Sequence, residues 1–221
     1  VAVADTQKIK CLRELGFLYQ DSEPSKGLEY ASQGVTLAEE AGHIHWEARC
    51  LNIMGVNYER LGNYTKAIQA HFKALDIYLR LKDEKGKSVS YNNLGQVYSY
   101  QGEYAKAINS HIKALEIRDK IGEKDLISVS LTNIGVTYYL MQDFTKALQS
   151  FQKALLIDEE REDKAGISKM LNNIGLVYEQ QEKYDEALFN YKRSLFIKQE
   201  IGDKLGVANS LGNVGNTYYN I

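Results

Sequence analysis

The stretch NNLGQVYSYQGEYAKAINSHIKALEI, residues 92–117, decides the fold of this chain because its residues recur at a fixed step. Gly95 and Tyr98 have counterparts every 40 residues, namely Gly55, Gly135, Gly175 and Gly215, and Tyr58, Tyr138, Tyr178 and Tyr218. Alanine and leucine recur at the same step in the second half of the stretch, as Ala67, Ala107, Ala147 and Ala187 and as Leu75, Leu115, Leu155 and Leu195. An earlier copy begins with LRELGFLY, where Gly16 precedes Gly55 by 39 residues. Such a repeat indicates stacked units that bury their apolar faces on one another.

Within one copy, the apolar residues follow the period of an α-helix. In residues 83–122 they form two stripes on either side of the segment YQGEY: Tyr91, Leu94 and Tyr98, then Ala107, His111 and Ala114. Each copy is therefore predicted to be two helices, A and B, of about 17–19 residues each. Glycine costs about 1 kcal/mol against alanine inside a helix. Its recurrence in helix A predicts a neighbour that comes too close for a side chain.

Boundary residues agree with this division. Gly62 and Gly102 stand at the turn between helices A and B. The start of helix A carries an acidic residue suited to capping its free N–H groups: Asp83, Glu123, Asp163 and Asp203.

Only one proline, Pro24, occurs in 221 residues, so nothing after it interrupts a helix by that route. The predicted fold is all-α, a right-handed α-solenoid of stacked antiparallel helix pairs with about 11 helices. We expect one solenoid domain over residues 1–221. Its units are 5–41, 43–82, 83–122, 123–162 and 163–202, and a final unpaired helix A covers 203–221.

The residues Tyr91, Leu94, Gly95, Tyr98, Ala107, His111 and Ala114 resemble the signature of the tetratricopeptide repeat (TPR) family. The usual TPR unit has roughly 34 residues and ends in proline, whereas that column here holds Leu79, Asp119, Glu159 and Gln199. The 40-residue unit is similar to the repeats of Leu-Gly-Asn adaptors, of kinesin light chains and of bacterial TPR sensor regions. The resemblance implies a scaffold for protein–protein interaction.

An asparagine recurs on the face of helix A turned away from helix B, at Asn93, Asn133, Asn173 and Asn213. A carboxamide offers a donor and an acceptor, as a peptide group does, so a column of asparagines can pair with any main chain. By resemblance, these four residues lie on the concave wall of the superhelix and hydrogen-bond the backbone of an extended peptide. The predicted groove also includes flanking residues, namely Asn92, Asn172, Gln96, Asn216, Tyr100, Leu140 and Gln180.

Two alternatives remain for the asparagines: a solvated helix face, or amides that bond to the adjacent repeat. The groove positions carry few basic residues, so a ligand chosen by its terminal carboxylate is disfavoured. The predicted function is to bind an extended segment of a protein or peptide partner. The alternative is an oligomerisation, spacer or sensor region of a bacterial signalling protein, such as a histidine kinase or nucleotide cyclase, whose catalytic domain lies outside this chain.

Other residues give weaker signals. His71 and His111 share the column of Phe151 and Tyr191, which favours helix packing over metal binding. Cys11 and Cys50 stand at equivalent places on adjacent A helices, and we expect two packed, reduced thiols. The charge run DEEREDK, residues 158–164, is expected to be a solvated face. No arrangement of nucleophile and base recurs, so we expect no enzyme activity, metal or cofactor.

Charge and hydropathy exclude two classes of partner, nucleic acid and the membrane interior. The net charge of -2 does not indicate a basic surface, so we do not expect a nucleic-acid partner. The sequence has no run of about 18 apolar residues, so we do not expect this segment to insert into a membrane. The chain begins with Val1, so we expect it to be a fragment of a longer protein. We expect this fragment to be a soluble segment, with the cytoplasm slightly favoured over the periplasm. The unpaired helix 203–221 could also join two copies in a homo-oligomer.

Overall fold

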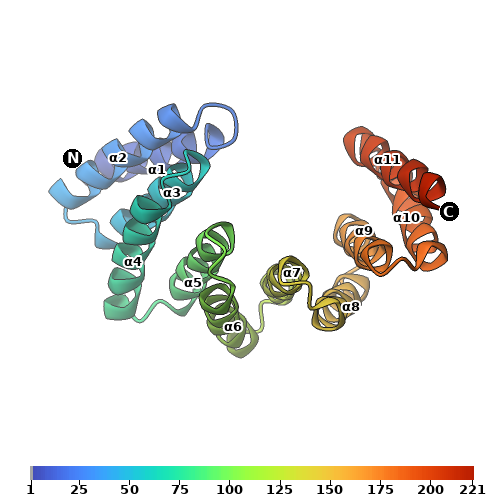
Figure 1. Cartoon of the computed structure of the whole chain (residues 1–221). Helices are drawn as coiled ribbons and strands as arrows, with labels where there is room; N and C mark the ends of the chain where they lie inside the picture. The colour runs from blue at the N-terminus through green and yellow to red at the C-terminus, as the bar shows by residue number, and fades with distance from the viewer. Residues whose placement is uncertain (1) are drawn as a thin grey trace. The chain divides into compact units, whose positions relative to one another are not determined.

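The computed structural model describes residues 2–221, with side chains from residue 5 onward. This part of the chain forms 11 helices and no strand, so the predicted all-α class is confirmed (Figure 1). The helices are α1 (Ala2–Leu18), α2 (Pro24–Glu40), α3 (Ile44–Arg60), α4 (Tyr64–Leu81), α5 (Glu84–Tyr100), α6 (Tyr104–Ile121), α7 (Lys124–Leu140), α8 (Phe144–Glu160), α9 (Lys164–Gln180), α10 (Tyr184–Glu200) and α11 (Lys204–Asn220). Odd-numbered helices are the A helices of the repeat, and even-numbered helices are the B helices.

Aspartate caps mark the starts of helices, and glycine turns follow their ends, at the places that the sequence predicted. Asp83, Asp163 and Asp203 each accept a hydrogen bond from a glycine N–H three residues later, at 2.9–3.0 Å. The prediction of a cap is wrong at Glu123, whose side chain makes no cap hydrogen bond, because the shorter aspartate side chain is preferred at this place. Gly62 and Gly102 have φ values of 72° and 74°, a left-handed conformation that glycine adopts without strain.

The chain divides into two compact units, residues 1–121 and 122–221. In unit 1, α1 pairs with α2, α3 with α4 and α5 with α6, and α2 packs on α3 as α4 packs on α5. Its core includes Ile9, Leu51, Ala74, Ile77 and Tyr78.

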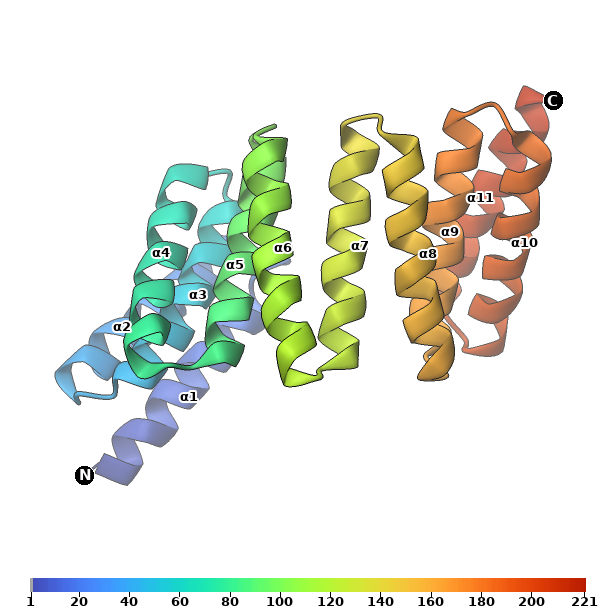
Figure 2. The same ribbon diagram turned by 90° about the horizontal axis from the view of Figure 1, so that it is seen from below.

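Unit 2 repeats this packing. Here α7 pairs with α8 and α9 with α10, and α8 packs on α9 as α10 packs on α11 (Figure 2). Its core includes Phe151, Ala154, Met170, Ile174 and Val177. The extent of a single domain over residues 1–221 stays a prediction.

The recurring glycine of the A helices lies against a ring of the paired B helix. A Cβ at Gly95 would be 2.6 Å from His111, and a Cβ at Gly175 would be 2.6 Å from Tyr191. The same contact joins Gly55 to His71 and Gly135 to Phe151. The predicted close approach and the packing role of His71 and His111 are therefore confirmed. Gly215 on α11 has no atom within 4 Å of its Cβ position, because no B helix covers this face in the described chain.

Candidate functional site

In unit 2, the helices α7, α9 and α11 form one layer and α8 and α10 form the other (Figure 1). The predicted ladder residues Asn133, Asn173 and Asn213 are all partly exposed. Each lies on the face of its helix opposite the recurring glycine, because positions two residues apart on a helix point about 200° apart. The open face of the A layer in unit 2, defined by these three asparagines and their neighbours, is called the asparagine face below.

Side-chain contacts join the three A helices of this face. Asn213 Nδ2 donates to Asn172 Oδ1 at 3.0 Å and so connects α11 with α9. Thr132 Oγ1 donates to the Ser128 carbonyl oxygen at 2.8 Å and lies 3.4 Å from Met170 Sδ, which is a contact between α7 and α9. The bond between an amide and the adjacent repeat, which the sequence left open as an alternative, therefore occurs at Asn213. The carboxamide of Asn173 has no hydrogen-bond partner among the described residues.

The chemistry of the asparagine face changes from α7 to α11. On α7, Asn133 stands in a stripe with Val129, Val136 and Leu140, whose exposed fractions are 44%, 39% and 45%. The same stripe on α9 holds Lys169, Asn173, Leu176 and Gln180, and on α11 it holds Asn209, Asn213, Asn216 and Asn220. Spacing of four, three and four residues puts each stripe on one side of its helix. Sequence reasoning missed Asn209, although this spacing along α11 would have identified it.

In unit 1, the predicted site residues make more contacts of their own. Gln96 Nε2 donates to Glu59 Oε1 at 3.3 Å, and burial raises the pKa of Glu59 to about 7. Tyr100 is 52% exposed, and its ring stacks on Tyr64 with centroids 6.2 Å apart. The ladder residue Asn93 is partly exposed and has no hydrogen-bond partner in the described part of the chain.

Asn92 lies at the side of this face and is buried. Its Oδ1 accepts a hydrogen bond from Arg118 Nη1 at 3.4 Å. Arg118 comes from the end of α6, so Asn92 helps to join helices A and B of its own repeat.

Arg118 belongs to a column of buried charged residues at the ends of the B helices that sequence reasoning missed, namely Arg118, Asp158 and Lys198, and Tyr78 holds the same place on α4. The expectation that residues 158–164 form a solvated face is wrong at Asp158, which is 2% exposed. Its carboxylate fits there because residue 166 is glycine, whose Cβ would lie 2.6 Å from Asp158 Oδ2. Burial raises the pKa of Asp158 and lowers that of Lys198.

The remaining candidates are structural. Both cysteines are free, as expected, but only Cys50 is packed, and burial raises the pKa of its thiol to about 12. Cys11 is exposed, so the expectation of a packed thiol is wrong there. His45 Nε2 lies 2.9 Å from Asp83 Oδ2, and His43 Nε2 lies 3.1 Å from Thr6 Oγ1.

The described residues contain neither a metal-binding cluster nor a helix suited to crossing a membrane. Among these residues, no three His, Cys, Asp or Glu side chains gather where they could hold a metal ion. Within residues 2–221, no helix combines the length and apolar character that crossing a bilayer requires.

The family profile of the tetratricopeptide repeat matches residues 87–160 and 166–220, which together make up more than half of the chain. The chain belongs to the tetratricopeptide repeat family. Proteins of this fold generally mediate protein–protein interactions and are typically non-catalytic scaffolds. No curated protein sequence matches the chain.

Several solved structures are similar in fold. BtubC (BKLC) from P. vanneervenii superposes with a TM-score of 0.79 and 20% identity, over 90% of this chain and 84% of that chain. A Rap protein complexed with competence and sporulation factor has a TM-score of 0.71 and 16% identity, over 97% and 64%. A signal transduction ATPase with a tetratricopeptide repeat sensor, from Pyrococcus horikoshii, has a TM-score of 0.70 and 17% identity, over 97% and 37%.

Proposed function

We propose that the asparagine face of unit 2 binds an extended peptide segment of a protein partner. The observation that carries this proposal is the set of partly exposed carboxamides at one place on each A helix, at Asn133, Asn173 and Asn213. Each carboxamide can donate to a peptide C=O and accept from a peptide N–H, so together they can hold a main chain of any sequence.

The stripes around Asn133 and Asn213 contain no charged residue, and the stripe around Asn173 contains one, Lys169. Val129, Val136 and Leu140 offer apolar contact on α7, and the stripe of α11 consists of asparagines. A peptide that crosses this face would pair its main chain with the amides and place apolar side chains over α7. The Rap protein of similar fold forms a complex with competence and sporulation factor, which supports a binding role for this chain.

In unit 1, Asn93 holds the equivalent place on α5, and Asn92, Gln96 and Tyr100 surround it. We propose that these residues form a separate peptide-binding surface within unit 1. Glu59 modifies it, because its buried carboxyl group engages Gln96. A ligand that displaces Gln96 would have to offer Glu59 a donor of its own.

Replacing Asn133 and Asn173 together by alanine is expected to weaken peptide binding by about 10- to 100-fold, because two hydrogen bonds to the ligand main chain are lost at about 1 kcal/mol or more each. The ligand is a peptide selected on the wild-type chain from a random nine-residue display library. Isothermal titration or fluorescence anisotropy gives its Kd.

The matched control removes two exposed amides from the other layer, Gln149 and Gln152 on α8, and is expected to leave Kd unchanged. N-methylation of the ligand amide that contacts Asn173 should raise Kd by the same factor as Asn173→Ala. The two changes combined should cost little more than either alone, since they remove the same bond. Equal affinities of the wild-type chain and the double-alanine variant would contradict the proposal.

The exposed face of α11 favours a second candidate function, self-association. Leu211 is 53% exposed and Tyr219 91% exposed, and the Cβ position of Gly215 faces open space. In every other A helix of unit 2, a paired B helix covers this face. Two copies that join through α11 would bury it.

Leu211→Glu is expected to abolish concentration-dependent dimerisation, because the charged side chain would lose its water at the interface. Sedimentation velocity from 5 to about 200 μM measures the association. Leu156→Glu on α8, where Leu156 is similarly exposed at 58%, serves as the control and should leave association intact. A wild-type chain that remains monomeric over this range rules out the second candidate.

A further inference from the structure

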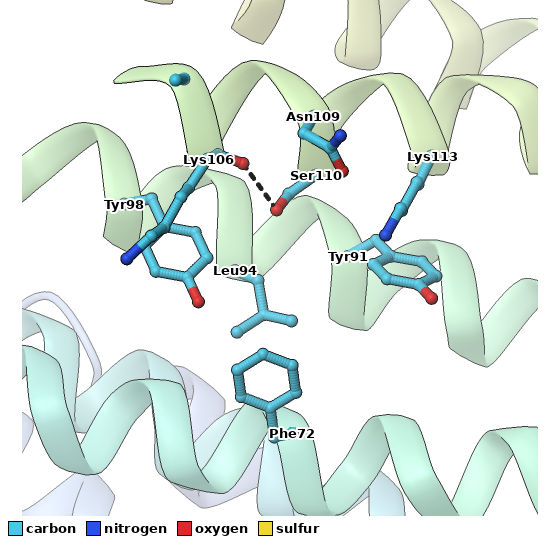
Figure 3. A pocket seen from close by; sticks show the side chains of 9 residues that line it. Phe72, Tyr91, Leu94, Tyr98, Lys106, Asn109, Ser110 and Lys113 are labelled. Atoms are coloured by element: carbon cyan, nitrogen blue, oxygen red, sulfur yellow. Dashed lines mark hydrogen bonds between the residues drawn. The ribbon is translucent and has the colours of Figure 1, made fainter. Parts of the chain in front are cut away.

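A pocket of about 370 Å³ opens in unit 1 on the side of the B helices, away from the predicted peptide site. Leu94 of α5 lies at its centre and is 1% exposed, and Phe72 of α4 forms one wall with 47% of its side chain exposed (Figure 3). Tyr91 and Tyr98 lie at the two ends of the pocket. The size is at the small end for ligand sites and suits one large side chain.

Both ends of the pocket carry a lysine from α6. Lys106 Nζ lies 5.5 Å from the ring centroid of Tyr98, and Lys113 Nζ lies 5.4 Å from that of Tyr91 (Figure 3). Lys106 also pairs with Glu103, whereas Lys113 has no carboxylate within ion-pair distance among the described residues. No acidic residue is among the described residues that line the pocket, and Lys113 gives one end of its rim a positive charge.

The equivalent place one repeat earlier is occupied differently. Ser32 stands where α4 has Phe72, and Met54 stands where α5 has Leu94. The Ser32 hydroxyl donates to Met54 Sδ at 3.7 Å, so these two side chains span the place between α2 and α3. The side chains between α2 and α3 therefore differ from Phe72 and Leu94, which line the pocket between α4 and α5.

We propose that this pocket binds a partner segment that inserts one large apolar side chain between two carboxylates. Phe72 and Leu94 provide the apolar contact, and Lys106 and Lys113 provide the complementary charges. Seven residues separate the two lysines, which places them about 10 Å apart along α6. An extended peptide with acidic residues two before and two after a phenylalanine puts all three side chains on one face. Its two carboxylates then lie about 13 Å apart, within reach of the flexible lysines.

The probe is the peptide acetyl-Glu-Ser-Phe-Ser-Glu-amide, titrated into the ¹⁵N-labelled 221-residue chain and followed by NMR. We expect amide shifts that cluster at the pocket residues of α4, α5 and α6. The charge-reversed peptide acetyl-Lys-Ser-Phe-Ser-Lys-amide should bind about 10-fold more weakly, since two exposed ion pairs become repulsive. Replacement of the central phenylalanine by serine should abolish the shifts.

A charge swap on the protein completes the test. Lys113 is exposed, so Lys113→Glu should leave the fold intact. This variant should bind the acidic peptide more weakly and the basic peptide more tightly than the wild-type chain. Lys153→Glu, at the same place on α8 but outside the pocket, should change neither. Equal binding of the two charged peptides, shifts away from the pocket, or no effect of Lys113→Glu would each overturn the proposal.

Discussion

Between pH 7 and pH 5, the wild-type chain is expected to lose about 4 kcal/mol of stability relative to a variant with His71→Phe and His111→Phe. Burial lowers the pKa of His71 to about 3 and that of His111 to about 4. The unfolded chain therefore binds more protons than the folded chain below about pH 6.5. Each histidine contributes its full stability above that pH and loses about 2 kcal/mol of it by pH 5.

Phenylalanine suits both positions because Phe151 occupies the same place in another repeat and packs on the same glycine. His71 Nδ1 lies 3.0 Å from Asn52 Oδ1, so His71→Phe also removes one contact, but this loss does not depend on pH in this range. Glu59 acts in the opposite direction, since its raised pKa makes the folded chain more stable below pH 7. That effect is equal in both proteins and cancels in the difference.

Urea denaturation followed by circular dichroism at pH 7, 6 and 5 measures the difference in free energy of unfolding. The single variants should each account for about half of it. A difference that stays constant between pH 7 and pH 5 would show that neither imidazole resists protonation in the folded chain.

Alanine at two places in the same glycine column is expected to change stability in opposite directions. Gly175→Ala should destabilise the chain by about 1–3 kcal/mol, because its Cβ would lie 2.6 Å from the buried ring of Tyr191. Tyr191 cannot move away freely, since its hydroxyl donates to Glu179 Oε2 at 2.7 Å. Gly215→Ala should stabilise it by up to about 1 kcal/mol, because alanine has the higher helix propensity and the space is open.

Each glycine variant is the matched control for the other, because both share the repeat position and the chemical change. Urea unfolding midpoints at constant m-value report the sign directly. A loss of stability in Gly215→Ala similar to that in Gly175→Ala would mean that a ring also covers Gly215 in solution, as self-association through α11 would produce.

The repeat of 40 residues was sufficient to predict helix class, helix number and the positions of turns and caps. These features follow from local rules: apolar period, glycine at left-handed turns and aspartate at helix starts. The packing of His71 and His111 could also be predicted, because Phe151 and Tyr191 share their column. Local spacing of side chains carries all of this information.

Whether each polar side chain is buried or exposed could not be predicted in the same way. Asp158 stands in a run of charged residues, yet its carboxylate is buried where Gly166 leaves room for it. Cys11 and Cys50 stand at equivalent positions, yet one is exposed and the other packed. The pocket around Leu94 depends on Phe72 and Lys113, which lie on different helices.

The sequence by itself thus determined the succession of helices, because each helix is specified by residues within about four positions of one another. Only the tertiary structure decided which amides have partners of their own. Asn213 bonds to Asn172, 41 residues away, while Asn173 has no partner among the described residues. The two asparagines are identical in repeat position, and they differ only in what the adjacent helix places beside them.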